Sequence, residues 1–144
     1  MCLKRILIVE DDSDTRLAYH IILKVKHYET FFAKDPLSCL WEAHRFKPNL
    51  IIMDIGLTAG DGFRAMSQLK AAAHLAEIPV IVVSGGDKKA FKSRALSFGA
   101  YAYLQKPIDP KEMMNVIARL IGDSDEEVTP GESSDLRRLS AVNT

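Results

Sequence analysis

The stretch NLIIMDIGL, residues 49–57, places four apolar residues directly before an aspartate and a glycine two positions after it. A short apolar run that follows Pro48 and Asn49 is typical of a strand buried in a parallel sheet. This strand ends on Asp54. A carboxylate at the mouth of a buried strand is costly unless a cation or a hydrogen-bond donor pairs with it. The rest of the chain is therefore expected to supply that partner.

Strand-like and helix-like segments alternate from residue 5 to residue 121. Each short apolar run is followed by a segment whose apolar residues recur at helical spacing. We assign strands to residues 5–9, 30–33, 49–54, 79–84 and 100–105, each followed by a helix. Because parallel strands need crossover connections, five such pairs predict an α/β fold: a (βα)5 doubly wound, flavodoxin-like, five-stranded parallel sheet with helices on both faces.

Residue patterns also indicate where the helices lie. Apolar residues at four-residue spacing indicate the first helix, with Asp12 or Ser13 as its N-cap. The apolar residues of the first helix are Leu17, Ile21 and Val25. One face of the second helix carries Leu37, Leu40, Trp41 and His44. Asp-Pro pairs at residues 35–36 and 109–110 predict helix starts, and the glycines at 99 and 122 predict helix ends.

Bulk composition limits the classes of function. With 19 basic and 19 acidic residues the formal net charge is zero, so we expect no direct nucleic-acid partner. We expect a single domain over residues 1–122 and a flexible acidic tail or linker over 123–144, where too few apolar residues offset the ordering entropy. Cys2 and Cys39 lack metal-ligand spacing and are expected to be free thiols. No apolar run approaches the roughly 20 residues that cross a bilayer, so a cytoplasmic protein without a membrane partner is expected.

Polar side chains follow the central strands. Glu10 and Asp11 follow the first, Asp54 ends the third, and Ser84 and Lys106 end or follow the fourth and fifth. Ligands of an open parallel sheet bind outside the carboxyl ends of its strands. Each residue alone has a plainer explanation as a helix cap or a strand end that reaches water. Together, carboxylates about 4 Å apart repel by about 4 kcal/mol at an effective dielectric near 20, so the cluster favours a hard cation, above all Mg²⁺.

The same residues indicate phosphoryl chemistry. Asp54 on a rigid strand end is the natural nucleophile, because carboxylates form acyl phosphates. Lys106 and Ser84 are donors suited to phosphoryl oxygens, and a metal ion with the lysine would neutralise the charge on the transferring group. The bond from Lys106 to Pro107 is one that readily adopts the cis form.

Four stretches now carry a resemblance: ILIVEDD (6–12), LIIMDIGLTAGDG (50–62), VIVVSGG (80–86) and YAYLQKP (101–107). Together they resemble the receiver domain of bacterial two-component response regulators, over about residues 3–121. The resemblance implies the strand order 2-1-3-4-5. It implies that Asp54 accepts a phosphoryl group from a phosphohistidine of a sensor histidine kinase or a histidine phosphotransfer protein. It also implies an Mg²⁺ site made by Glu10, Asp11, Asp54 and the backbone carbonyl of Gly56.

The resemblance further implies a switch. Ser84 would move toward the phosphate and Tyr103 would turn inward, repacking the face of the fourth helix, fifth strand and fifth helix, which would also serve for dimerisation. Thr58 stands where the family often has proline. Glycines at 56 and 86 occupy positions that influence dephosphorylation in such domains, so the lifetime of the phosphate does not follow from the sequence.

We therefore expect a phosphorylation-dependent signalling module and not an enzyme with an external substrate. Its partners would be the phosphodonor and a downstream protein target or an output domain outside these residues. An Mg²⁺-dependent aspartyl phosphohydrolase is an alternative, although such enzymes usually carry a second acid where Gly56 stands. A degenerate receiver that acts as a scaffold is a further alternative, against which the complete acid set argues. A flavin or nucleotide module is disfavoured because the loop EDDSD (10–14) would repel phosphate.

Overall fold

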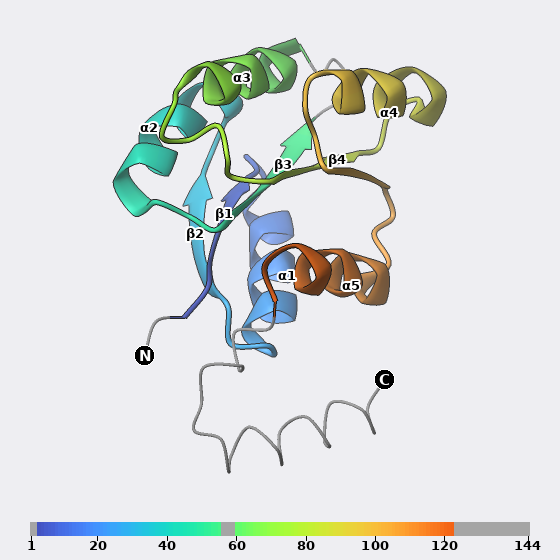
Figure 1. The fold of residues 1–144 in the computed structure, drawn as a ribbon. Coiled ribbons are helices and arrows are strands. Elements are labelled where there is room, and N and C mark those ends of the chain that lie inside the picture. The colour runs from blue at the N-terminus through green and yellow to red at the C-terminus, as the bar shows by residue number, and fades with distance from the viewer. Residues whose placement is uncertain (1–2, 56–59, 123–144) are drawn as a thin grey trace.

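The computed structural model describes residues 3–55 and 60–122. Within them, strands and helices alternate strictly along the chain (Figure 1). The elements are β1 (Arg5–Val9), α1 (Ser13–Lys24), β2 (Glu29–Ala33), α2 (Pro36–Phe46), β3 (Leu50–Ile55), α3 (Gly60–Ala71), β4 (Val80–Ser84), α4 (Lys88–Ser97), β5 (Ala102–Gln105) and α5 (Pro110–Ile121). The predicted (βα)5 alternation is confirmed. The fifth strand begins two residues later than predicted, after Tyr101, which is exposed.

The strands form one parallel sheet in the order β2-β1-β3-β4-β5. This is the order that the family resemblance implied. Figure 1 shows α2, α3 and α4 on one side of the sheet and α1 and α5 on the other. The sheet is therefore covered on both faces, which explains why every residue of the central strand β3 is buried.

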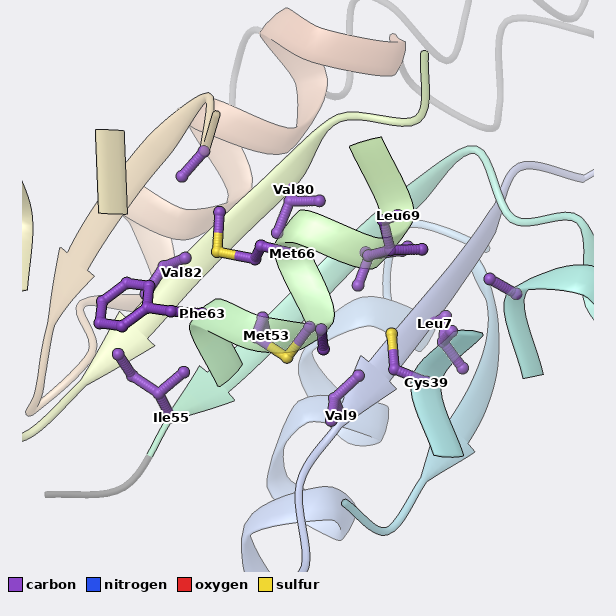
Figure 2. Close-up of a cluster of buried hydrophobic side chains, with 14 of the residues drawn as sticks. Leu7, Val9, Cys39, Met53, Ile55, Phe63, Met66, Leu69, Val80 and Val82 are labelled. Atoms are coloured by element: carbon purple, nitrogen blue, oxygen red, sulfur yellow. The ribbon is translucent and has the colours of Figure 1, made fainter. Parts of the chain in front are cut away.

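Alternation along the strands divides the core into two clusters. Ile51, Met53 and Ile55 of β3 belong to the cluster under α2, α3 and α4, which we call the α2/α3/α4 face. Figure 2 shows this cluster, where side chains of the strands meet those of the helices. Leu50 and Ile52 belong to the opposite cluster, under α1 and α5, which we call the α1/α5 face. Since successive residues of a strand point to opposite sides, the alternation directs Asp54 to the α1/α5 face.

Capping residues fix the helix ends as predicted. The side chain of Asp12 caps α1, and Asp35 and Asp109 cap α2 and α5, each of which has proline in its first turn. Gly99 follows α4 with φ of 100°, a left-handed conformation that glycine adopts without steric cost, and Gly122 ends α5.

The apolar spacing that predicted α1 lies on the wrong side of the helix. Leu17, Ile21 and Val25 are 55 %, 57 % and 70 % exposed, whereas Tyr19 and Leu23 are buried. The helix therefore exists but is turned so that a tyrosine and a leucine face the sheet. In α2 the predicted face is correct only in part, because Leu40 packs against the core whereas Leu37 and Trp41 are exposed. The fully buried residues of α2 are Cys39 and Ala43. Three of the four buried residues, Tyr19, Cys39 and Ala43, are small or amphipathic, so a pattern of large aliphatic side chains does not identify them.

Several predictions fall on residues 1–2, 56–59 and 123–144. Cys2, the Gly56 carbonyl, Thr58 and the acidic tail lie outside the described residues. Cys39 is a free, buried thiol, and burial raises its pKa to about 12. Among the described residues, no helix has both the length and the apolar character needed to span a bilayer.

Candidate functional site

The ends of the central strands lie at one edge of the sheet. Asp54 pairs with Val83, and Ser84 pairs with Gln105. The backbone N–H of Lys106 donates to the carbonyl of Ser84 at 2.8 Å, which extends the β4–β5 pairing by one residue. The Lys106–Pro107 peptide bond is cis. The sheet thus carries the lysine and the aspartate to the same edge, as the sequence predicted.

Asp54 is buried and has two donors on one oxygen. Its Oδ2 accepts a hydrogen bond from the Tyr19 hydroxyl at 2.9 Å and pairs with the Lys106 Nζ at 3.0 Å. Lys106 is partly exposed, so its side chain reaches the buried carboxylate from the solvent side. Charge-assisted donors of this kind offset the cost of burying a carboxylate. They are the partner that the buried strand end required.

Glu10 lies beside Asp54 in the same buried place. It is 7 % exposed, and its Oε1 accepts a hydrogen bond from the backbone N–H of Asp12 at 3.1 Å. Burial raises the pKa of the Glu10 carboxyl to about 8, and hydrogen bonding with Asp54 and the negative charge of Asp54 add to the effect. Two neighbouring buried carboxylates would repel each other if both were ionised. Either a proton on Glu10 or a cation between the two groups relieves this repulsion.

A cleft of about 240 Å³ opens above these carboxyl groups. Asp11 is exposed and lies on the cleft wall. The wall is formed by Val9, Glu10, Asp11, Lys34, Asp35, Pro36, Asp54, Ile55, Asp61, Gly62 and Lys106. A Cβ at Gly62 would overlap the Ile55 side chain, so the lack of one lets α3 approach the end of β3 closely. The cleft therefore brings together three of the predicted metal-binding residues and the lysine.

Asp12 does not line this cleft and has the plainer role. Its Oδ2 accepts hydrogen bonds from the Thr15 hydroxyl at 2.7 Å and the Thr15 backbone N–H at 2.9 Å. These hydrogen bonds lower the pKa of the Asp12 carboxyl. Asp12 is therefore the N-cap of α1, as one reading of the sequence held.

The donor set of the cleft fits a hard cation. In the part of the chain that the structure describes, no three His, Cys, Asp or Glu side chains are grouped closely enough to hold a metal ion by themselves. Mg²⁺ does not need such a group, because it commonly binds to one or two carboxylates and keeps several waters. Glu10 and Asp54 supply oxygen donors. Burial, and after it the neighbouring Asp54, raises the pKa of Glu10, and a cation would relieve the repulsion between the two carboxylates.

Ser84 and Tyr103 lie apart from this cleft. Ser84 is fully buried, and its hydroxyl accepts a hydrogen bond from the Gly86 N–H at 2.9 Å. Alternation along β4 directs it to the α2/α3/α4 face, away from Asp54. Tyr103 is buried on that face; its hydroxyl donates to Gln105 Oε1 at 2.9 Å, and Gln105 Nε2 donates to the Gly86 carbonyl at 3.0 Å. Ser84 and Tyr103 are thus connected through Gly86 and Gln105.

Tyr19 is the site residue that the sequence reasoning missed. Burial raises the pKa of its hydroxyl, as does the nearby charge of Asp54, so the group stays protonated and donates. Tyr19 lies on a helix, whereas the other predicted residues lie at or just after the ends of strands. The available signal was a tyrosine four residues before Leu23, the spacing of a buried helical face.

Comparisons with known proteins agree with this geometry. A family model described as the response regulator receiver domain matches residues 6–118. The polar-differentiation response regulator DivK of Brucella anthropi is 31 % identical over 121 residues, which cover 84 % of this chain and 98 % of the relative. A receiver domain of a signal transduction histidine kinase from Syntrophus aciditrophicus is 27 % identical with a TM-score of 0.74, covering 88 % of this chain and 94 % of that one.

A second solved structure shares the fold. It is the receiver domain of a sensor histidine kinase from Pseudomonas aeruginosa, with 24 % identity and a TM-score of 0.74 over 85 % of this chain and all of that one. Magnesium is coordinated in its active-site cleft. Sequence family, strand order and the acid-lysine edge of the sheet lead to one conclusion: this chain belongs to the response regulator receiver domain family of two-component signalling.

Proposed function

We propose that Asp54 is the phosphoacceptor of this receiver and takes its phosphoryl group from a phosphohistidine of a histidine kinase or histidine phosphotransfer protein. One observation carries the proposal. The buried carboxylate of Asp54, the last residue but one of the central strand β3, faces a cleft and pairs with a lysine at 3.0 Å. In the transfer, the bond from phosphorus to the histidine nitrogen breaks and a bond from phosphorus to an Asp54 oxygen forms, giving an acyl phosphate.

Lys106 and Glu10 prepare the carboxylate for this step. Lys106 holds the carboxylate in one orientation and places a positive charge where the phosphoryl oxygens arrive. Glu10, Asp11 and Asp54, with the Gly56 carbonyl, would hold Mg²⁺, which when bound supplies positive charge to the phosphoryl oxygens. The Pseudomonas aeruginosa receiver, which shares the fold, has magnesium in its corresponding cleft.

Ser84 and Tyr103 would change conformation in response to the phosphate. In the described conformation the Ser84 hydroxyl accepts from Gly86, so the serine must leave that hydrogen bond to reach a phosphoryl oxygen. Gly86 is also joined to Tyr103 through Gln105. Movement of Ser84 would thereby alter the surroundings of Tyr103 and the surface of α4, β5 and α5, where a protein target or a second copy would bind.

The domain would end at residue 122 and be followed by an acidic tail or linker. Its activity would be self-catalysed phosphotransfer and autodephosphorylation in the cytoplasm, without nucleic-acid or membrane contact. The output would be a change in affinity for a target protein or for an attached domain. The described cleft has no feature that favours an external phosphate ester over this role.

The test is labelling with acetyl phosphate and Mg²⁺, followed by intact mass measurement. The unsubstituted chain is expected to gain one phosphoryl group that hydroxylamine removes, and Asp54→Asn is expected to gain none. Asp61→Asn is the matched control, because Asp61 is an exposed aspartate on the wall of the same cleft. Undiminished labelling of Asp54→Asn would move the acceptor to another residue, and an unmodified parent chain would refute the proposal.

A further inference from the structure

The Tyr19 hydroxyl is a buried donor that the family resemblance assigns no role. It belongs to α1 and is 4 % exposed, and it contacts the very oxygen that pairs with Lys106. The ring packs in the α1/α5 cluster, which is otherwise apolar around it. An aliphatic side chain could fill such a place. A phenol at this position adds one group that an aliphatic residue lacks, and that group points at the carboxylate.

The local structure leaves the hydroxyl little freedom. Asp12 caps α1 and sets the start of the helix, and Tyr19 and Leu23 face the sheet one turn apart. With its ring buried in the α1/α5 cluster, Tyr19 has its polar tip at the end of β3. The two donors share Asp54 Oδ2, since both the Lys106 ammonium and the Tyr19 hydroxyl contact that atom. The tyrosine is therefore part of the site and not a remote core residue.

The strength of this hydrogen bond depends on the charge of its acceptor. A hydrogen bond to an ionised carboxylate is roughly twice as strong as one between neutral groups. When the acyl phosphate forms, the carboxyl group of Asp54 loses its own negative charge to the new P–O bond. The Tyr19 hydroxyl then faces a neutral acyl oxygen, and part of the hydrogen-bond energy is lost. The phenol accordingly favours the free carboxylate over the phosphorylated one.

The same preference acts during hydrolysis. Water attacks phosphorus, the P–O bond to Asp54 breaks, inorganic phosphate leaves, and the bonding electron pair returns to the carboxylate. Negative charge grows on the carboxyl group as the bond breaks, and a fixed donor beside it stabilises that growing charge. We propose that Tyr19 is a catalytic residue of this receiver, whose hydroxyl holds the Asp54 carboxylate and shortens the life of the acyl phosphate. This inference rests on the proposed function.

Tyr28 provides a matched control within the same fold. It has the same 4 % exposure and belongs to the same cluster, but its hydroxyl donates to the Gly122 carbonyl at 2.8 Å and not to the site. Tyr19→Phe and Tyr28→Phe each remove one buried phenolic oxygen and keep the ring. Urea unfolding of both variants establishes that they fold before their phosphate is followed.

The experiment labels each chain with acetyl phosphate and Mg²⁺, removes the donor and follows the phosphorylated fraction by intact mass. Tyr19→Phe is expected to retain phosphate about 3- to 10-fold longer than the unsubstituted chain, from the usual difference in strength between a hydrogen bond to a charged group and one to a neutral group. Tyr28→Phe is expected to lose it at the unsubstituted rate. An unchanged or shortened lifetime in Tyr19→Phe overturns the inference while leaving Asp54 as acceptor. A parent chain that takes no phosphate overturns the proposed function and this inference together.

A spectroscopic measurement on the unsubstituted chain makes the test independent of the variant's folding. The Cζ carbon of tyrosine, labelled with ¹³C, reports on the hydrogen bond of the hydroxyl, and the two substitutions assign the signals. Phosphorylation is expected to shift the Tyr19 signal and leave the Tyr28 signal in place. A Tyr19 signal that does not move contradicts the inference.

Discussion

The two faces of the sheet contribute different things to the same edge. The α1/α5 face carries Tyr19 and is the face to which alternation directs Asp54, so its apolar cluster surrounds an ionic site. The α2/α3/α4 face is apolar up to the sheet edge, where Tyr103, Gln105 and Gly86 form a chain of neutral hydrogen bonds. The residues proposed to react with the phosphoryl group therefore lie on one face of the β-sheet. The residues proposed to change conformation afterwards lie on the other face. This difference predicts that the two sides can be perturbed separately.

The largest effect is expected from the core of the α2/α3/α4 face. Phe63, which is labelled in Figure 2, belongs to this core. It is 1 % exposed, and its ring stacks on Phe98 with centroids 5.2 Å apart. Phe63→Ala is expected to lower the free energy of unfolding in urea by about 3–5 kcal/mol, because the cavity adds to the lost burial. Mg²⁺ affinity, measured by calorimetry on folded protein, is expected to stay unchanged. A fall in Mg²⁺ affinity alongside stability would show that the two faces do not act separately.

A smaller effect is expected from pH on the α1/α5 face. The pKa of Glu10 is about 8 in the folded chain against 4.5 as its ordinary value, so between these pH values the folded state holds a proton that the unfolded state releases. Stability without divalent metal should therefore fall as pH rises from 5 to 8, by roughly 3 kcal/mol from this group. Thermal unfolding in a chelator measures it. Glu10→Gln is the control, and parallel pH profiles of the two chains would contradict the assignment.

The smallest effect is expected from the neutral hydrogen-bond chain. Gln105→Ala removes the acceptor of the Tyr103 hydroxyl and the donor to the Gly86 carbonyl. We expect a loss of about 1–2 kcal/mol in urea, because the substitution removes two hydrogen bonds between neutral groups. The pH profile attributed to Glu10 should be unaffected. Gln68→Ala on the exposed side of α3 is the control, and an equal loss there would mean that Gln105 contributes nothing specific.

Local signals in the sequence predicted the fold and half of the site. Strand periodicity and Asp-Pro caps depend on neighbouring residues, which is why the alternation and the helix ends were predicted well. Glu10, Asp54 and Lys106 could be found because a strand ends in each case at the same edge of a parallel sheet. The rotation of α1 about its axis depends on what packs beneath it, so helical spacing alone offered both Leu17 and Tyr19 as buried residues and did not decide between them.

Contacts between distant side chains were also beyond the sequence. His74 Nε2 lies 2.8 Å from His44 Nδ1, although the two residues are 30 positions apart in the chain. Nothing near either residue in the chain indicates that α2 and the segment after α3 meet there. The link from Tyr103 through Gln105 to Gly86 is of the same kind, because it joins β5 to the loop after β4.

Gly86 has a consequence for how this domain can be altered. A Cβ at that position would overlap the ring of Phe91, so any larger residue there requires the ring of α4 to move. Engineers who wish to tune the signal duration by placing side chains beside Ser84 would therefore also disturb the α4 surface that partners are proposed to recognise. A substitution at Gly86 is therefore expected to change the proposed duration of the signal and the proposed recognition surface together, whereas Tyr19 lies on the α1/α5 face of the sheet.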